Sequence, residues 1–167
     1  NAETVRQQLQ DFNIDYSLIN DVSRPTTLKK RYLVDHQKIF RVSRVKEHGL
    51  PRDVEDQLIS EIYRLAPDFN GILISDFVYG VITPRVLEAV KHVALTHGIM
   101  LFGDLQCSSQ IGNVAKFVDF DLLCPTEREA RIALSDNEQS IEWIAMTLQD
   151  RTRAKNLLMK MGSDGFI

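Results

Sequence analysis

The spacing of apolar residues changes near residue 50 and divides the sequence into two kinds of structure. After Pro51, apolar positions with helical spacing alternate with short, continuous apolar runs that are typical of buried parallel strands. The predicted helices span about 54–65, 84–97, 125–134 and 140–153, and the predicted strands span 71–75, 99–103, 120–124 and 156–159. This alternation predicts an α/β fold, with a mainly parallel sheet and helices on both of its faces.

One of these helices carries clear signals at both ends. Thr83 is a suitable N-cap, Pro84 fits the first turn, and Gly98 is placed to end the helix.

The first 50 residues favour a different arrangement. Residues 2–12 have the spacing of an amphipathic helix, and residues 14–19 are predicted to form a short strand. Two β-prone stretches, 26–34 and 38–45, flank a polar turn and predict a hairpin.

Composition narrows the class of protein. With 167 residues, 44% hydrophobic and 26% charged, the chain fits one globular domain. Cys107 and Cys124 lack the paired spacing of a zinc site or a disulfide framework, so we expect free thiols. No apolar run reaches the roughly 20 residues of a membrane span, and no signal-peptide pattern begins the chain, so we expect a cytoplasmic protein without membrane contact.

The charge distribution bears on the partners of the protein. A formal net charge of −3 argues against nucleic-acid binding. Basic residues nevertheless concentrate in the predicted hairpin and just after it: Lys29, Lys30, Arg31, Lys38, Arg41, Arg44 and Lys46. They alternate with apolar residues, so they form either a solvated strand face or a surface for an anionic substrate.

Polar residues follow four of the predicted strands. Asp76, Asp104, the pair Thr126 and Glu129, and the glycine-containing turn 162–165 each come directly after a strand. Ligands of open parallel sheets bind beyond the carboxyl ends of the strands. Carboxylates there can hold hydrated magnesium, and glycine-turn amides can hold phosphates. An aspartate after a strand also commonly caps a helix, so only the whole set indicates a site.

Other nucleotide-binding motifs are absent from the sequence. Neither G-x-x-x-x-G-K-[ST] nor a G-x-G-x-x-G after a strand occurs, which disfavours P-loop kinases and Rossmann dehydrogenases. We interpret the four histidines as structural or solvated, because none has a nucleophile partner in a suitable context. The polar loop 108–110 either touches a ligand or is a plain loop.

Several segments resemble motifs of the ribokinase-like (PfkB-type) carbohydrate kinases. The stretch RPTTLKKR at 24–31 resembles the R-P-T-T-x-K-x-R with which bacterial heptose-phosphate kinases enter a β-hairpin lid over the sugar site. SDFVYG at 75–80 resembles S-D-Y-x-K-G, GD at 103–104 resembles the start of D-P-K, CPTERE at 124–129 resembles T-P-N-x-x-E, and KMGSDG at 160–165 resembles T-x-G-x-x-G.

The resemblance implies a fold and an activity. It implies a three-layer, mainly parallel ribokinase-like sheet with a lid hairpin at about 26–45 and an α/β core at about 52–167, together a partial kinase domain over residues 1–167. The implied activity is ATP-dependent phosphorylation of a sugar or sugar phosphate, for example a heptose phosphate, with Mg²⁺. We expect the family's glycine-rich sugar segment before Asn1 and its catalytic aspartate after Ile167, so this fragment alone should be inactive.

The resemblance also assigns roles to individual residues. The residues implied at the nucleotide and its phosphates are Asp104, Thr126, Glu129, Lys160, Gly162 and Gly165, and Glu129 would also contact the metal through water. The residues implied at the border of the substrate site are Asp76, Gly80, Lys29 and Arg31.

Four departures from the family pattern keep other hypotheses open. Tyr79 and Gln106 stand where relatives carry lysine, Thr126 replaces an asparagine, and Lys160 replaces a threonine. These changes motivate a second hypothesis, a noncatalytic sensor of sugar phosphate or nucleotide with the kinase fold. A third hypothesis is an interaction module whose hairpin mediates dimerisation, since edge strands readily pair. For the kinase, too, we expect a homodimer that forms through the hairpin.

Overall fold

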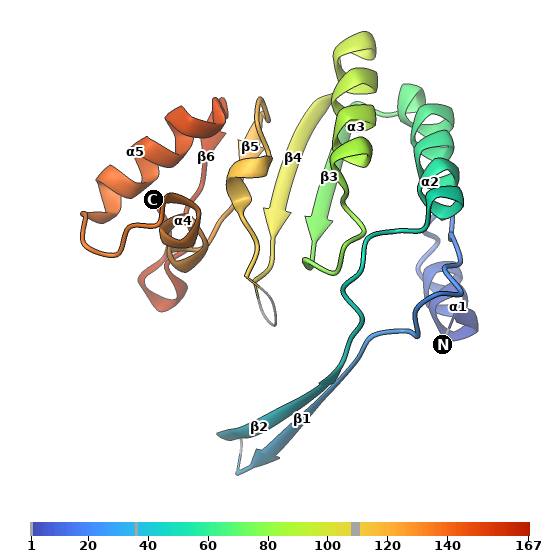
Figure 1. Ribbon diagram of the computed structural model, residues 1–167, viewed down its shortest axis with the longest axis horizontal. Helices are drawn as coiled ribbons and strands as arrows, with labels where there is room; N and C mark the ends of the chain where they lie inside the picture. The colour runs from blue at the N-terminus through green and yellow to red at the C-terminus, as the bar shows by residue number, and fades with distance from the viewer. Residues whose placement is uncertain (1, 36, 108–110) are drawn as a thin grey trace.

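A parallel sheet and a separate antiparallel hairpin organise the structure, a computed structural model that describes residues 2–35, 37–107 and 111–167 (Figure 1). The parallel sheet has the order β3 (Gly71–Asp76), β4 (Met100–Leu105), β5 (Leu122–Leu123) and β6 (Asn156–Leu157). The hairpin consists of β1 (Leu28–Val34) and β2 (Gln37–Arg44). The predicted fold class, a mainly parallel α/β sheet with a hairpin near the N-terminal part, is confirmed.

Helices connect the parallel strands and also begin the chain. They are α1 (Ala2–Asp11), α2 (Arg52–Leu65), α3 (Pro84–His97), α4 (Glu127–Leu134) and α5 (Ile141–Thr152), with 3₁₀ turns η1 (Ala66–Asp68), η2 (Val114–Lys116) and η3 (Gly162–Asp164). The end signals of α3 are confirmed: the Thr83 hydroxyl accepts a hydrogen bond from the Val86 amide, and Gly98 ends the helix at φ +68°.

One hydrophobic core lies against one face of the sheet. Ile74, Leu101 and Leu105 point into it from β3 and β4, and α3, η2, α4 and α5 cover them. The opposite face is more open: Leu73 is 69% exposed and Met100 is 48% exposed. Within the described residues, helices therefore cover one face of the sheet, and the predicted helices on both faces are not found there.

The N-terminal strand prediction is wrong. Residues 14–19 form no strand and instead run past α2, where the Ser17 hydroxyl donates to Glu61 at 2.8 Å. A strand needs a partner backbone, and this segment pairs with neither sheet.

Two predicted strands are also shorter than expected. β5 begins at Leu122, because the chain turns at Asp119 (φ +66°) and Phe120 is buried against Phe117, with ring centroids 5.1 Å apart. β6 ends at Leu157, although backbone bonds continue to Lys160.

Candidate functional site

The carboxyl ends of the parallel strands meet at one edge of the sheet. Figure 1 shows β3 and β4 ending at the edge from which the hairpin projects. The register pairs Ser75 with Asp104, and Asp76 with Leu105. Because neighbouring residues of a strand point to opposite faces, Asp76 and Asp104 share this edge but lie on opposite faces of the sheet.

Asp76 lies on the core side of the sheet and is almost fully buried. Its carboxylate forms an ion pair with Lys116 and accepts a hydrogen bond from the Val78 amide at 2.9 Å. The Lys116 ammonium also lies 5.3 Å from the centre of the Phe117 ring. Sequence reasoning missed Lys116, which is 40 residues from its partner in a segment without periodicity. The pair holds the loop after β3 in place.

Asp104 lies on the other face and is paired with Lys160. The Lys160 ammonium is 2.7 Å from Asp104 Oδ1, and the Gln106 side-chain amide donates to Oδ2 at 3.3 Å. Both side chains are partly exposed, so a phosphate could reach the ammonium without unfolding of the turn. Asp104 and Gln106 therefore keep a cation at the strand ends.

Glu129 and Thr126 form a reciprocal cap at the start of α4. The Thr126 hydroxyl accepts from the Glu129 amide, and the Glu129 carboxylate accepts from the Thr126 amide at 2.8 Å. Its second oxygen accepts from the Cys107 amide at 2.9 Å. The backbone of Thr126 also pairs with that of Lys160 in an isolated parallel β-bridge. Backbone and side-chain contacts thus join Asp104, Thr126, Glu129 and Lys160 into one group.

The glycine turn closes the same edge. Gly162 and Gly165 have φ values of +66° and +88°, and an added Cβ at either would meet nothing within 4 Å. The Met161 amide donates to the Gly165 carbonyl at 2.8 Å, which returns the chain beside Lys160. The turn is exposed, with its backbone accessible next to the Lys160 group.

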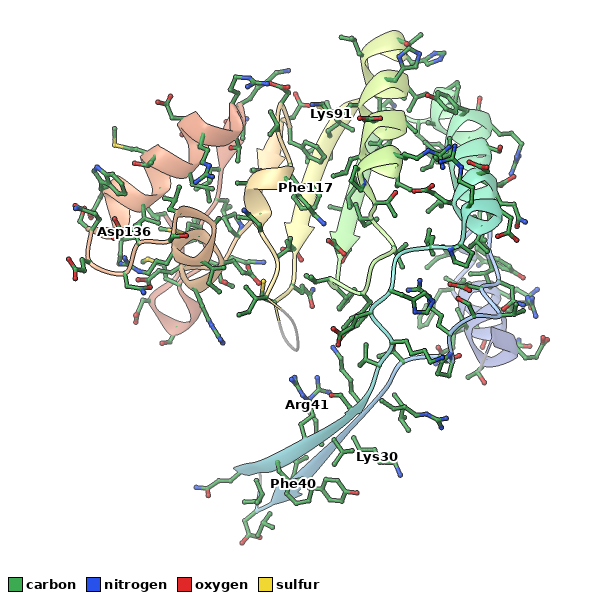
Figure 2. All side chains as sticks on the ribbon, viewed as in Figure 1. Lys30, Phe40, Arg41, Lys91, Phe117 and Asp136 are labelled. Carbon is green, nitrogen blue, oxygen red and sulfur yellow. The ribbon has the colours of Figure 1, made fainter. Side chains whose placement is uncertain are left out.

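The hairpin has two chemically different faces. Arg31 pairs with Arg41 and lies on the same face as Lys29, and Figure 2 shows Arg41 pointing toward the sheet, with Lys30 on the other side. The Lys29 ammonium lies 5.6 Å from the Phe77 ring and 5.1 Å from the Tyr79 ring. The basic face of the hairpin, Lys29, Arg31 and Arg41, therefore faces the loop after β3.

Gly80 lies where the hairpin meets this loop. Its φ is +81°, and an added Cβ would lie 2.4 Å from the His48 carbonyl oxygen. Glycine is required here by both the backbone conformation and the close approach.

Other expected features have definite outcomes. The expected ligand loop 108–110 lies outside the described residues. Among residues 2–35, 37–107 and 111–167, no group of three or more His, Cys, Asp and Glu side chains is placed to hold a metal ion. Of the helices described, none has the length and apolar character to cross a bilayer.

Sequence comparison finds bifunctional HldE proteins among the relatives of this chain, although no family model matches it. The bifunctional protein HldE of Hyphomonas neptunium is 29% identical over 93% of this chain, which covers 34% of that protein. The HldE of Helicobacter hepaticus is 24% identical over 95% of this chain, and the chain covers 33% of that protein. The HldE of Geotalea uraniireducens is 31% identical over 80% of this chain, and the chain covers 26% of that protein. The chain thus covers between 26% and 34% of the length of these relatives.

Solved structures agree on the fold. The tetrameric inhibited form of Escherichia coli phosphofructokinase-2 superposes with a TM-score of 0.71 at 15% identity, over 98% of this chain and 54% of that one. The same enzyme in complex with substrates and products gives a TM-score of 0.72 at 15% identity, over 98% and 53%. The chain is therefore similar in sequence to the bifunctional HldE proteins, and its fold is that of the phosphofructokinase-2 structures, the ribokinase-like fold.

Proposed function

We propose that this chain is part of an ATP-dependent kinase whose acceptor is a phosphorylated sugar, with a heptose phosphate as the leading candidate. The names of the sequence relatives and the ligands of the phosphofructokinase-2 structures support this class of activity. The observation that carries the proposal is the basic face of the hairpin opposite a strand edge whose carboxylates are already paired with lysines.

The charge balance of the edge suits two anionic ligands. Asp76 and Asp104 would repel a phosphate if they were unpaired, but Lys116 and Lys160 offset their charges. The basic face of the hairpin then adds positive charge without a carboxylate of its own on that face. A neutral sugar would gain little from this arrangement, whereas a sugar phosphate would gain charge-assisted hydrogen bonds.

We assign the substrate phosphate to Lys29 and Arg31, with Asp76 and Gly80 forming the border of the site. Lys29 is held over the Phe77 and Tyr79 rings, so its ammonium is already positioned at the border of the proposed substrate site. Arginine suits phosphate because its planar fork can donate two parallel hydrogen bonds.

We assign the ATP phosphates to the group around Lys160. The Lys160 ammonium would bind a phosphate oxygen, while amides of the turn that contains Gly162 and Gly165 would line the same ligand. Thr126 supports this turn through its bridge to Lys160. Asp104 orients the ammonium through their 2.7 Å contact.

The described side chains suit contact with the bound waters of a magnesium ion and not direct coordination of the ion. The Glu129 carboxylate accepts two backbone hydrogen bonds, and the Asp104 carboxylate is paired with Lys160, so neither offers an unengaged oxygen pair. Mg²⁺ commonly retains several waters and binds through nucleotide phosphates. We therefore propose that the nucleotide brings the ion and that Glu129 contacts its waters.

A group that deprotonates the acceptor hydroxyl is still needed. The carboxylates of Asp76 and Asp104 each contact a lysine, and we assign neither of them this role. We propose that the base is an aspartate outside these 167 residues.

We also propose that a second copy of the protein packs on the other face of the hairpin, where apolar side chains lie beside Lys30 and Arg44. Leu28, Tyr32, Phe40 and Val42 are exposed there, and the Tyr32 and Phe40 rings stack at 4.3 Å. Sedimentation of a Tyr32→Ser, Val42→Ser variant should show a loss of dimer, and an unchanged dimer would reject this surface.

The test of the acceptor uses the full-length protein, ATP, and a panel of phosphorylated and neutral sugars, with ADP release as the measurement. We expect turnover of a sugar phosphate, and a Lys29→Met, Arg31→Met variant should raise its KM by about 10-fold or more, since charged hydrogen bonds contribute about 1.5–3 kcal/mol each.

The matched control is Lys30→Met, which removes the same charge from the opposite face of the same strand. It should leave the KM unchanged. Folded protein that binds ATP but turns over no sugar would reject the kinase and favour the nucleotide sensor. Equal effects of the Lys30 variant and the double variant would reject the role of the basic face.

A further inference from the structure

The Arg24 side chain joins both ends of the hairpin to the loop after β3. The Arg24 guanidinium donates to the Tyr79 carbonyl at 2.7 Å and to the His48 carbonyl at 2.8 Å. Arg24 precedes β1, His48 follows β2, and Tyr79 belongs to the loop after β3. One planar group therefore ties together three segments that are far apart in the sequence.

The orientation of this guanidinium is itself fixed. Its Nε lies 2.5 Å from Asp21 Oδ2, and the side chains of Arg24 and Asp21 are only 14% and 10% exposed. The other oxygen of Asp21 accepts from the Ser23 amide at 2.9 Å and from the Ser23 hydroxyl at 2.5 Å. Both carboxylate oxygens are thus engaged, so Asp21 holds the fork of Arg24 in one plane.

The loop that receives Arg24 is held firmly to the sheet. Val78 has a φ of +63°, which is strained for a β-branched residue, and its amide donates to Asp76. Its side chain fills the space beside Gly112, where an added Cβ would lie 2.6 Å away. A loop that is locked in this way gives Arg24 a fixed point relative to the strand ends.

The hairpin extends well beyond the contacts that Arg24 makes at its base. The hairpin projects from the body beyond this junction, and nearly all of its described residues are exposed (Figure 1). The Lys29 ammonium over the Phe77 and Tyr79 rings is a further contact between the hairpin and the loop after β3. A small change at the base would therefore move the basic face of the hairpin by a larger amount.

We propose that Arg24, oriented by Asp21, is a positioning residue that sets the angle of the hairpin over the strand edge and thereby places Lys29 and Arg31 against the acceptor. This inference rests on the proposed function for its consequence in catalysis. The structural part, that Arg24 fixes the hairpin to the loop after β3, can be measured without any substrate.

The test compares Arg24→Lys with the full-length wild-type protein. Lysine keeps the charge but lacks the fork, so it cannot reach Asp21, Tyr79 and His48 together. Losing one charged hydrogen bond should make amide hydrogen exchange in residues 28–44 about 10-fold faster or more, while exchange in β3 and β4 stays unchanged.

Kinetics supplies the second readout. The KM for the phosphorylated acceptor should rise by about 10-fold to 100-fold, because small misplacements of binding groups are costly, and the KM for ATP should not change. Asp21→Asn should also raise the KM for the acceptor, by a smaller factor, and leave the KM for ATP unchanged. The control is Arg6→Lys on α1, an exposed arginine paired with Glu3, which should change neither readout.

The outcomes separate the two proposals. Unchanged exchange in the hairpin overturns the positioning role, and so does faster exchange spread equally over β3 and β4, which would indicate general destabilisation. Faster exchange confined to the hairpin, in a protein that phosphorylates no sugar, supports the junction and rejects the proposed function instead. An acceptor KM that stays at the wild-type value while the hairpin loosens overturns the positioning role in catalysis.

Discussion

The ion pair between Asp76 and Lys116 can be tested by a double-mutant cycle. The variants are Asp76→Asn, Lys116→Met and the combination of the two. Asparagine keeps an oxygen for the Val78 amide, and methionine keeps an apolar stem beside the Phe117 ring, so each change removes mainly the charge. The coupling free energy then reports the pair itself.

The size of the coupling follows from burial. Removing one partner of a fully buried pair costs about 3–5 kcal/mol, because an unpaired charge is left behind. Asp76 is 3% exposed, but Lys116 is 29% exposed and can turn toward water. We therefore expect Asp76→Asn to cost about 2 kcal/mol and the coupling to be about 1–2 kcal/mol.

Urea unfolding followed by circular dichroism measures these free energies. The matched control is the exposed pair of Glu3 and Arg6, whose side chains are 85% and 46% exposed. Its coupling should be about 0.5 kcal/mol or less. If the effects of Asp76→Asn and Lys116→Met add to within about 0.3 kcal/mol, then the pair does not hold the loop and the assignment of its role is wrong.

Two further predictions concern backbone strain and pH. Gly80→Ala should cost more than the roughly 1–2 kcal/mol of a left-handed alanine, because its Cβ meets the His48 carbonyl, whereas Gly98→Ala, with open space, should cost only that amount in urea unfolding; equal costs would contradict the close approach. A hydrogen bond from Lys155 holds the pKa of Asp121 below its usual range, so its contribution to stability is present above that range and lost as pH falls through the lowered pKa. Asp121→Asn should therefore flatten the acid side of the stability curve, and an unchanged slope would refute this contribution.

Local signals in the sequence were enough to predict the elements whose causes are local. The cap, the first-turn proline and the final glycine of α3 act within a few residues, so the sequence predicts both ends of that helix. Residues 14–19 have the local pattern of a strand but form none, because strand pairing depends on a partner backbone that the local pattern does not specify.

The candidate site is predictable only to the level of the sheet edge. Parallel topology brings Asp76 and Asp104 to the same edge, as the sequence implies. Their placement on opposite faces depends on the register between β3 and β4, which no local pattern determines. The two lysines that pair with them come from distant segments, and only the folded chain reveals that each carboxylate is neutralised.

This neutralisation supports the proposal that a strand edge with several carboxylates binds two anions. Placing acidic side chains near phosphate is unfavourable unless cations offset them. In this proposal Lys160 exchanges Asp104 for a phosphate, since both side chains are partly exposed, while Lys116 stays with buried Asp76 and the loop that receives Arg24. The exposed pair therefore suits ligand exchange, and the buried pair suits the fixed support from which the hairpin is positioned.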